Sequence, residues 1–487
     1  MVWSFYGRGE ELDKVDAILA RSRWSFVRVT GRRRIGKTTL VQHALADRQT
    51  PVLYCQIPDS APAGVLVAFR DALETFRIDP SVVAPPVSLS DMANAVGALV
   101  RRGYVVVLDE FQYFHRTQLA EFCSHLQRVV DALTHDAANV SGVLFVLGSI
   151  HTEMVAILED RGAPLYGRAT DVMELDHLDI AAVREILRAH ADESPERLLF
   201  LWNLFEGVPK FYRDCFEQGV LGESREELLR TIFFQSSAPL RGEAENWFLH
   251  ELRGRYDLVL KYIATHPGAS NGEVESHAQS VGDANADQVG GYIKILLERY
   301  RMIEKRQPIF AKEKARRSRY YIRDNFLRSW LGALAPSVAA VNFRPIDELV
   351  SRANERLMEA EGYGLERLVA ALYAERSRKG LPGFTLTRRI DGYWDKAGTE
   401  IDFVAVDEEG RRIRFGFCKR DPAKLAPSLH DCDAHLARFL AAQRQYAVYQ
   451  VEKVAIAPRL DSVVREAIAA RTGWQAQDLV DLVDGIE

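Results

Sequence analysis

Paired cysteines and long apolar runs are both lacking in this chain of 487 residues. The five cysteines are scattered and never form a Cys-x-x-Cys pair, which argues against a disulfide framework or a zinc ribbon and favours a reducing compartment. No run approaches the about 18 apolar residues of a membrane-spanning helix, and the amino terminus has no apolar stretch of signal-peptide length. We therefore expect a cytoplasmic protein without a membrane segment.

An excess of one charge sign is lacking as well. The formal net charge is −5, which argues against a protein that coats nucleic acid over its whole surface. Neither an internal repeat nor a low-complexity segment is visible. With 47% hydrophobic and 27% charged residues, the composition is that of a globular protein. At about 150 residues per domain, the length suggests about three domains.

The first 175 residues alternate between apolar runs and amphipathic stretches. Continuously apolar, β-branched runs are typical of strands buried on both faces, and their alternation with helices predicts a parallel sheet flanked by helices. The predicted strands are Trp24–Thr30, Val52–Ile57, Tyr104–Leu108 and Val143–Leu147. We therefore predict an α/β core over residues 1–175.

The first of these strands leads directly into Gly31-Arg32-Arg33-Arg34-Ile35-Gly36-Lys37-Thr38, which matches the phosphate-loop pattern G-x-x-x-x-G-K-[ST]. Glycines permit a turn whose backbone N–H groups face the phosphates, Lys37 adds positive charge, and the following helix presents its positive end. Thr38 is the expected Mg²⁺ ligand. The sequence thus predicts an ATP and Mg²⁺ site, with these nucleotide-binding residues: Gly31, Arg34, Ile35, Gly36, Lys37, Thr38 and Thr39. Lys37 is also a candidate catalytic residue.

Two acids follow the strand Tyr104–Leu108, so their carboxylates are expected at the sheet edge beside the phosphate loop. Asp109 would hold Mg²⁺, and Glu110 would polarise the attacking water. Ser149 ends the next predicted strand, where it either senses the γ-phosphate or caps the strand. Arg168 is either an arginine finger, acting within the chain or on a neighbouring copy, or part of a surface salt bridge.

Several motifs, in order, resemble the archaeal-type ATPase family, which belongs to the AAA+/STAND-related P-loop ATPases. The opening Phe5–Leu12 is similar to its F-h-G-R-E-x-E-L box, Asp109–Tyr113 to its extended Walker B, and Pro164–Arg168 to its P-L-Y-G-R motif. Gly207-Val208-Pro209 resembles its G-x-P motif in a helical lid. The resemblance implies that Gly7, Arg8 and Pro209 help hold the nucleotide base. It favours ATP, and no N-K-x-D box of GTPases is present.

The middle of the chain reads as helices over residues 176–245, followed by a segment of different character over 246–335. There, helices are predicted at Tyr256–Thr265, Asn271–Ser280 and Asp287–Tyr300, with a hairpin that pairs Met302-Ile303 with Tyr320–Ile322. Three helices and a hairpin are typical of a winged helix. Arg301–Arg328 holds ten Lys/Arg against three Asp/Glu, including the run 312–319, and so predicts a wing that lies against DNA phosphates. A protein-binding or regulatory role is the alternative.

Residues 336–487 resemble the PD-(D/E)xK nuclease-like domain of unknown function that similar ATPases carry. Tyr363–Arg367 resembles the helix of the first carboxylate, Glu400–Ala405 the E-I-D strand, and Phe415–Lys419 stands where the family has G-E-C-K. The resemblance implies a site of Glu366, Asp402 and Lys419. Phe417 replaces a carboxylate that would bind Mg²⁺, so we expect a degenerate site, although Glu400 leaves a rearranged one open. The pattern after Pro336 predicts helices through Glu359 and at Leu365–Ala374, and strands at Phe384–Thr387, Glu400–Val406 and Ile413–Cys418. The acidic end, Gln477–Glu487, is expected to be a solvated tail.

Three functions are compatible with these patterns. The first is an ATPase whose nucleotide state controls DNA binding by the winged helix and the nuclease-like domain. The second is an ATP-dependent signalling or scaffold protein, in which the winged helix binds a protein partner. The third is an ATP-gated DNA nuclease. An arginine finger that acts in trans would require a homo-oligomer.

Overall fold

The chain divides into two compact units in the computed structural model, which describes residues 2–46, 48–149, 151–243, 256–281, 288–312 and 317–487. One unit comprises Gly7–His177 and Val208–Lys210, and the other comprises Met1–Tyr6, Leu178–Gly207 and Phe211–Glu487. Within the described residues, none of the helices has the length and apolarity that a membrane crossing requires. The five cysteines are buried and form no disulfide.

The first unit is built on a five-stranded parallel sheet with the order β2-β3-β4-β1-β5. Its strands are β1 (Ser25–Gly31), β2 (Val52–Gln56), β3 (Val105–Asp109), β4 (Val143–Gly148) and β5 (Asp171–Leu175). Every residue of β3 and β4 is buried, as expected of central strands covered on both faces. The predicted α/β fold and its four predicted strands are confirmed.

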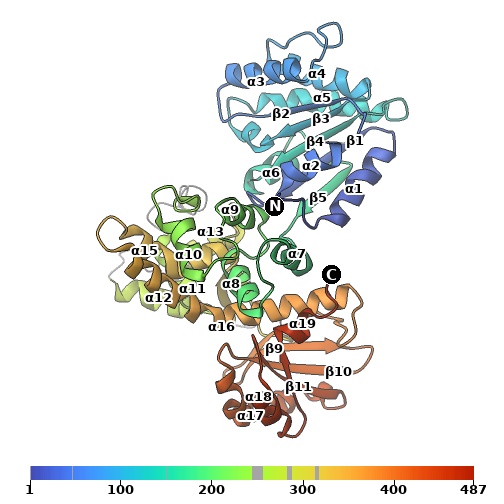
Figure 1. The fold of residues 1–487 in the computed structure, drawn as a ribbon. Helices are drawn as coiled ribbons and strands as arrows, with labels where there is room; N and C mark the ends of the chain where they lie inside the picture. Colours follow the sequence, from blue (N-terminus) through green and yellow to red (C-terminus); the bar gives the residue numbers. More distant parts are fainter. Residues whose placement is uncertain (1, 47, 150, 244–255, 282–287, 313–316) are drawn as a thin grey trace. The chain divides into compact units, whose positions relative to one another are not determined.

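Helices flank this sheet on both sides (Figure 1). They are α1 (Gly9–Ala20), α2 (Lys37–Ala46), α3 (Pro62–Thr75), α4 (Leu89–Arg101), η1 (Phe111–His115), α5 (Glu121–His135) and α6 (His151–Leu158). The helices α3, α4 and α5 bury their apolar faces in one cluster with the sheet, in which Phe69 and Phe122 are fully buried. Ser88 caps α4, since its side chain accepts a hydrogen bond from the N–H of Asp91.

The second unit begins with helices and then changes to a helical segment with a hairpin. The helices before this segment are α7 (Ile180–His190), α8 (Pro195–Phe205), α9 (Pro209–Glu217), whose first two residues belong to the first unit, α10 (Arg225–Leu229) and the π-helical turn η2 (Arg230–Phe234). The segment itself consists of α11 (Asp257–Thr265), α12 (Asn271–Ser280), α13 (Val289–Glu298), β6 (Ile303–Arg306) and β7 (Arg319–Ile322). The pairing of Ile303 with Ile322 confirms the predicted hairpin. Residues 313–316 of the basic run, Asp287 and the expected boundary between 245 and 246 lie outside the described residues.

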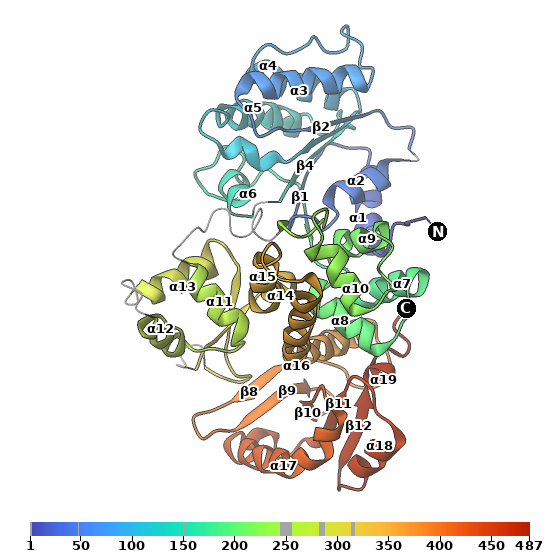
Figure 2. The same ribbon diagram turned by 60° about the vertical axis from the view of Figure 1, so that its left-hand side comes forward.

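The carboxyl-terminal part of the second unit is a mixed five-stranded sheet with the order β12-β11-β10-β9-β8 (Figure 2). Its strands are β8 (Asp391–Trp394), β9 (Glu400–Asp407), β10 (Arg412–Cys418), β11 (Gln450–Ala457) and β12 (Trp474–Asp478). The accompanying helices are α14 (Asn325–Ser329), η5 (Trp330–Leu334), α15 (Ala335–Ala339), α16 (Ile346–Arg378), η6 (Pro422–Lys424), α17 (Leu425–Ala442), η7 (Arg444–Tyr446), α18 (Ser462–Ala469) and α19 (Leu479–Val483).

Three expectations about this part were wrong. The two helices that were expected before and after Glu359 form the single helix α16. Residues Phe384–Thr387 do not form a strand. The acidic end of the chain is not a solvated tail, because it forms part of β12 and all of α19. Leu479 and Ile486 are fully buried there, and the guanidinium of Arg184 donates to the carbonyls of Val483 and Ile486 at 2.6 and 2.5 Å.

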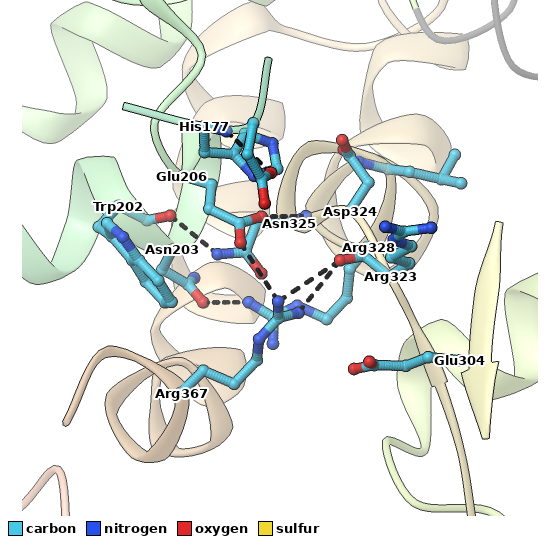
Figure 3. Close-up of polar contacts among 12 residues, drawn as sticks. His177, Trp202, Asn203, Glu206, Glu304, Arg323, Asp324, Asn325, Arg328 and Arg367 are labelled. Carbon is cyan, nitrogen blue, oxygen red and sulfur yellow. Dashed lines mark hydrogen bonds and ion pairs between the residues drawn. The ribbon is translucent and has the colours of Figure 1, made fainter. Parts of the chain in front are cut away.

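A buried polar cluster joins α8, α14 and α16 within the second unit (Figure 3). Arg328 donates to Oδ1 of Asn203 at 2.5 Å, and the side chain of Asn325 donates to the carbonyl of Trp202 at 3.0 Å. Arg367 of α16 forms an ion pair with Glu206 at 3.3 Å. Because buried polar groups are costly to leave unpaired, this cluster fixes how the three helices pack.

The hairpin β6–β7 packs against the carboxyl-terminal sheet. The N–H of Ile309 donates to the carbonyl of Gly392 at 2.9 Å, and the indole of Trp394 donates to the carbonyl of Arg317 at 2.9 Å. The guanidinium of Arg319 lies 4.6 Å from the centre of the Trp394 ring, within cation–π range. The hairpin therefore packs against the part of this sheet that β8 and β9 form.

Candidate nucleotide site and carboxyl-terminal cavity

The phosphate loop connects β1 to α2 at the carboxyl edge of the parallel sheet. Gly31 and Gly36 have φ values of +154° and +94°, so the loop uses backbone conformations that glycine adopts readily. The ammonium of Lys37 donates to the carbonyls of Gly31 and Arg32, both at 3.0 Å. Burial lowers the pKa of Lys37 to about 8, against the opposing effect of Glu110 and Asp109. Arg34 has a φ of +66°, Ile35 is buried, and Thr39 lies in the first turn of α2.

Thr38 and Asp109 are brought together where Mg²⁺ was expected. The hydroxyl of Thr38 donates to Oδ2 of Asp109 at 2.5 Å, and the hydroxyl of Tyr54 donates to the same oxygen at 2.8 Å. Burial raises the pKa of Tyr54, and the charge of Asp109 adds to this shift, so the phenol stays a donor. A hydroxyl and a carboxylate are oxygen ligands that suit Mg²⁺, and the residues present fit this ion.

Glu110 is oriented by a residue that was not predicted as part of the site. Glu110 has a left-handed backbone, with φ of +54°, and its carboxylate accepts a hydrogen bond from the side-chain amide of Gln112. The other end of that amide, Oε1, accepts from the N–H of Ser149 at 3.2 Å. Gln112 is only 1% exposed. It therefore links the end of β3 to the end of β4. Its place within the motif Asp109–Tyr113 was the sequence feature that could have identified it as a site residue.

The residues of the opening box and of the G-x-P motif lie beside the phosphate loop. Arg8 donates to the carbonyls of Ile35 and Asp176, at 3.2 and 2.5 Å, and forms an ion pair with Glu11 at 2.7 Å. Gly7 precedes it with a φ of +62°. A Cβ atom placed on Gly36 would lie 3.6 Å from Cγ of Pro209. These contacts place Gly7, Arg8 and Pro209 near the loop.

Arg168 contacts a carboxylate rather than the phosphate loop. Its guanidinium donates to both oxygens of Asp131 on α5, at 2.7 and 3.1 Å, and to the carbonyl of Tyr166 at 3.2 Å. The hydrogen bond to Asp131 raises the pKa of Arg168, so its charge is permanent. The surface salt bridge considered from the sequence is therefore present in this conformation.

The second candidate site is a cavity of about 490 Å³ in the carboxyl-terminal part of the second unit. Glu366 reaches it from α16, Glu400 and Asp402 from β9, and Lys419 from the end of β10. These four residues, which the resemblance to nuclease-like domains singled out, thus line one cavity. Phe417 also lines it, is 4% exposed, and packs with its ring centre 5.7 Å from that of Trp474.

Burial dominates the electrostatics of this cavity. It raises the pKa of Glu366 well above its ordinary value, and the neighbouring charge of Asp402 adds to the effect. It also raises the pKa of Asp402 to about 6, although the N–H of Cys418, which donates to Oδ2 at 2.7 Å, opposes the shift. Two carboxyl groups in such a place resist being charged together.

No group of three or more His, Cys, Asp or Glu side chains within the described ranges is arranged to hold a metal ion. The missing carboxylate at Phe417 accounts for this in the cavity, because its position carries a buried aromatic ring instead. Mg²⁺ can be held by two carboxylates when water and a substrate phosphate complete its shell. The described side chains of the cavity therefore do not supply a complete set of metal ligands.

Two arginines of the hairpin line the same cavity and were not predicted as site residues. Arg306 and Arg319 lie on β6 and β7. Arg319 forms an ion pair of 2.7 Å with Glu400, and Arg306 forms one with Glu304. From the sequence, both arginines were expected in a basic segment that faces DNA. Only the contact between the hairpin and the sheet shows that they also line this cavity.

Comparisons with known proteins cover the first unit and extend into the second. Residues 5–211 match a family described as an ATPase domain predominantly from Archaea. An uncharacterized protein of Methanocaldococcus jannaschii is 25% identical over 415 residues, covering 84% of this chain and 86% of that protein. The Walker-type ATPase of Pyrococcus abyssi has a TM-score of 0.52 at 17% identity, covering 67% of this chain and 96% of its own. The ORC2 protein of Aeropyrum pernix has a TM-score of 0.47 at 16% identity, covering 74% and 97%. The likeness to the Pyrococcus structure concerns the fold, and the family match shows that residues 5–211 are similar to an archaeal-type ATPase domain.

Proposed function

We propose that the archaeal-type ATPase domain binds and hydrolyses Mg²⁺-ATP and that its nucleotide state controls DNA binding by the second unit. The observation that carries the hydrolysis is the convergence of Lys37, Thr38, Asp109 and Glu110 at one edge of the parallel sheet. Thr38 and Asp109 would hold the ion, which when bound neutralises charge on the phosphate oxygens. The loop N–H groups and Lys37 hold the phosphates, and Glu110 orients the attacking water.

Gln112 positions the catalytic carboxylate in this proposal. A side-chain amide that spans Glu110 and the N–H of Ser149 holds the carboxylate at the end of β3. Because the amide is buried, its orientation is restricted by packing. In this proposal the backbone N–H of Ser149 holds Gln112 in place, and its side chain contacts the γ-phosphate.

An arginine finger at Arg168 is part of the proposal and requires that its ion pair with Asp131 be exchanged for a phosphate contact. If Arg168 acts on a neighbouring copy, the protein works as a homo-oligomer. Mixing Lys37→Ala, which cannot hold the phosphates, with Arg168→Ala tests this. Turnover restored by mixing supports action in trans, and turnover that stays at the sum of the two inactive proteins excludes it.

The DNA-binding half of the proposal rests on the second unit. Helices α11, α12 and α13 with the hairpin β6–β7 have the order of a winged helix, and the mixed sheet with α16 has the order of a PD-(D/E)xK domain. Exposed basic side chains follow one another along this segment. They are Lys294, Arg299, Arg301, Lys305, Lys312 and Arg317. Contacts of this kind bind the DNA backbone with little dependence on sequence.

We propose that the carboxyl-terminal domain binds DNA without cutting it. A buried phenylalanine stands at the position of a metal-binding carboxylate, two residues before Lys419. Incubation of the protein with Mg²⁺ or Mn²⁺ and duplex or single-stranded DNA should leave the DNA intact. Cleavage that disappears in Asp402→Ala would instead establish the ATP-gated nuclease.

The decisive experiment measures ATP turnover with and without duplex DNA at two salt concentrations. We expect DNA to change the rate, the change to shrink at high salt, and all turnover to disappear in Lys37→Ala. Turnover that is indifferent to DNA at low salt, with no DNA binding, would contradict the coupling. A protein partner of the helical segment would then be the better account.

A further inference from the structure

The carboxylate of Asp109 accepts hydrogen bonds from three donors in different parts of the first unit. Oδ2 accepts from the hydroxyl of Thr38 at 2.5 Å and from the hydroxyl of Tyr54 at 2.8 Å. Oδ1 accepts from the N–H of Glu110 at 2.8 Å. A carboxylate offers about four acceptor sites, so these donors take most of them. Since Asp109 is only 3% exposed, the three bonds decide which way its carboxylate faces.

Tyr54 reaches this carboxylate because of the register between β2 and β3, which lie side by side (Figure 1). Gln56 is paired with Asp109 in that register, and Tyr54 lies two positions before Gln56. Side chains two apart on a strand point to the same face of a sheet, so Tyr54 and Asp109 share a face. Leu53 and Cys55 point to the other face and are buried in the cluster with α3, α4 and α5. The ring of Tyr54 therefore extends diagonally toward Asp109.

The ends of the two strands are also joined through the backbone. The N–H of Ile57, directly after β2, donates to the carbonyl of Asp109 at 2.9 Å. This bond fixes the main chain of Asp109 relative to β2, and the hydroxyl of Tyr54 fixes the side chain relative to the same strand. The orientation of Asp109 is thus set from β2, which carries no part of the phosphate loop.

The two hydroxyls that contact Oδ2 differ in what else they have to do. Thr38 is itself an expected Mg²⁺ ligand, so its oxygen has a second task when an ion is held. No such task falls to Tyr54 in the proposed site. An O–H bond to a charged oxygen is also one of the stronger hydrogen bonds. Tyr54 can therefore hold Asp109 in place whether or not Thr38 is engaged.

We propose that Tyr54 is a positioning residue of the nucleotide site, whose hydroxyl holds the carboxylate of Asp109 in the orientation that Mg²⁺ bound with ATP requires. Hydrogen-bond partners of metal ligands typically contribute about 10- to 100-fold in metal affinity. Tyr54 belongs to none of the motifs that resemble the ATPase family, and the contact with Asp109 alone assigns it to the site. The inference rests on the proposed binding of Mg²⁺-ATP and adds a residue that acts through Asp109.

The variant Tyr54→Phe removes the hydroxyl and keeps the ring on β2. Binding of a fluorescent, non-hydrolysable ATP analogue is measured by anisotropy, once in EDTA and once in excess Mg²⁺. We expect the affinity in EDTA to stay the same and the affinity in Mg²⁺ to fall about tenfold. Tyr104→Phe is the matched control, because Tyr104 directly precedes β3 and lies at the opposite end of that strand from Asp109. It should bind as the unaltered protein does under both conditions.

A double variant shows whether Tyr54 acts through Asp109. Once Asp109→Asn has removed the charge, the further change Tyr54→Phe should have no additional effect on the affinity in Mg²⁺. A second tenfold loss in the double variant would overturn the proposal, because Tyr54 would then act on the ion or the nucleotide by itself.

Two other results of the single variant would also overturn this inference. An equal loss of affinity in EDTA and in Mg²⁺ would mean that the hydroxyl of Tyr54 supports the fold of the site and not the ion. Unchanged affinity under both conditions would mean that the contact with Asp109 is dispensable. In either case the proposed function stands as long as the unaltered protein binds the analogue more tightly in Mg²⁺. An unaltered protein that does not bind the analogue in Mg²⁺ would overturn the proposed function as well.

Discussion

The hydroxyl of Thr38 lies 2.5 Å from Oδ2 of Asp109, which joins the first turn of α2 to the last residue of β3. The two residues are 71 positions apart in the chain. The parallel sheet brings them together, since the carboxyl ends of β1 and β3 meet at one edge. Four predictions follow from this edge and from the carboxyl-terminal cavity.

Replacing Asp109 with Asn should separate nucleotide binding from its dependence on Mg²⁺. The amide keeps the size of the side chain and loses the charge that an ion requires. We expect turnover to fall about 100-fold, which corresponds to about 2.7 kcal/mol of activation free energy. ATP affinity measured with and without Mg²⁺ should become nearly equal. A variant in which Mg²⁺ still strengthens ATP binding as before would contradict the assignment of Asp109.

Replacing Glu110 with Gln should leave ATP bound and unhydrolysed. A positioned general base contributes about 10² to 10⁴ in rate, so turnover should fall by at least 100-fold while ATP affinity is kept. Gln112→Leu should lower kcat about tenfold with little change in KM, because it loosens Glu110 without touching the phosphates. A change confined to KM in Gln112→Leu would show that this residue acts on binding instead.

Replacing Gly31 with Ala should destabilise the first unit. A Cβ atom there would come within 2.5 Å of the carbonyl oxygen of Leu175, and the φ of +154° is strained for a residue with a side chain. We expect a loss of about 2 to 4 kcal/mol in the free energy of unfolding, measured with denaturant. Gly9→Ala is the control, because its Cβ atom meets nothing within 4 Å and alanine favours the helix α1. Equal stabilities of the two variants would contradict the geometry of the loop.

Replacing Asp402 with Asn should stabilise the protein most above pH 6 and very little below pH 4. Burial raises the pKa of Asp402 from 3.8 to about 6. Between these values the folded protein binds the proton that the unfolded chain has released, so stability falls as the pH rises through this window. The amide removes the cost of the buried charge, about 3 kcal/mol, and can still accept from the N–H of Cys418. Unfolding curves at about pH 4 and pH 8 in EDTA measure the difference, and an equal effect at both would contradict it.

The sequence predicted the parts of the fold that local patterns specify. Four of the five strands of the parallel sheet were predicted, and two of them, β3 and β4, follow from continuous apolar runs. The strand β5 was missed because it lies at the sheet edge and carries two acids among its five residues, so it has no continuous apolar run. The helices α11 and α12 were predicted almost to the residue, since a capping serine and a turn mark their ends. The hairpin was predicted with its pairing, but its first strand, β6, extends three residues beyond the predicted Met302-Ile303.

Long-range pairing accounts for what could not be predicted. The end of the chain, Gln477–Glu487, was expected to be solvated because it carries four acids and no base. Its carbonyls are held by Arg184 and Arg376 from far earlier in the sequence. Phe384–Thr387 has the composition of a strand but forms none.

In the candidate site, too, local motifs were predicted and long-range contacts were not. The phosphate loop and the two acids of β3 are recognisable from spacing alone. The role of Gln112 depends on where its side chain points, and the pairing of Arg319 with Glu400 spans 81 positions. Neither relationship leaves a local pattern in the sequence.

The hairpin β6–β7 belongs by sequence to one segment and by contact to another. An exchange of the carboxyl-terminal domain between relatives, with a junction near residue 336, would separate Arg319 from Glu400 and Tyr321 from Tyr363. A chimaera of that kind would combine two halves of the cavity that come from different proteins. Because these contacts cross the junction, we expect substitutions on the hairpin to be accompanied by substitutions on α16 and β9.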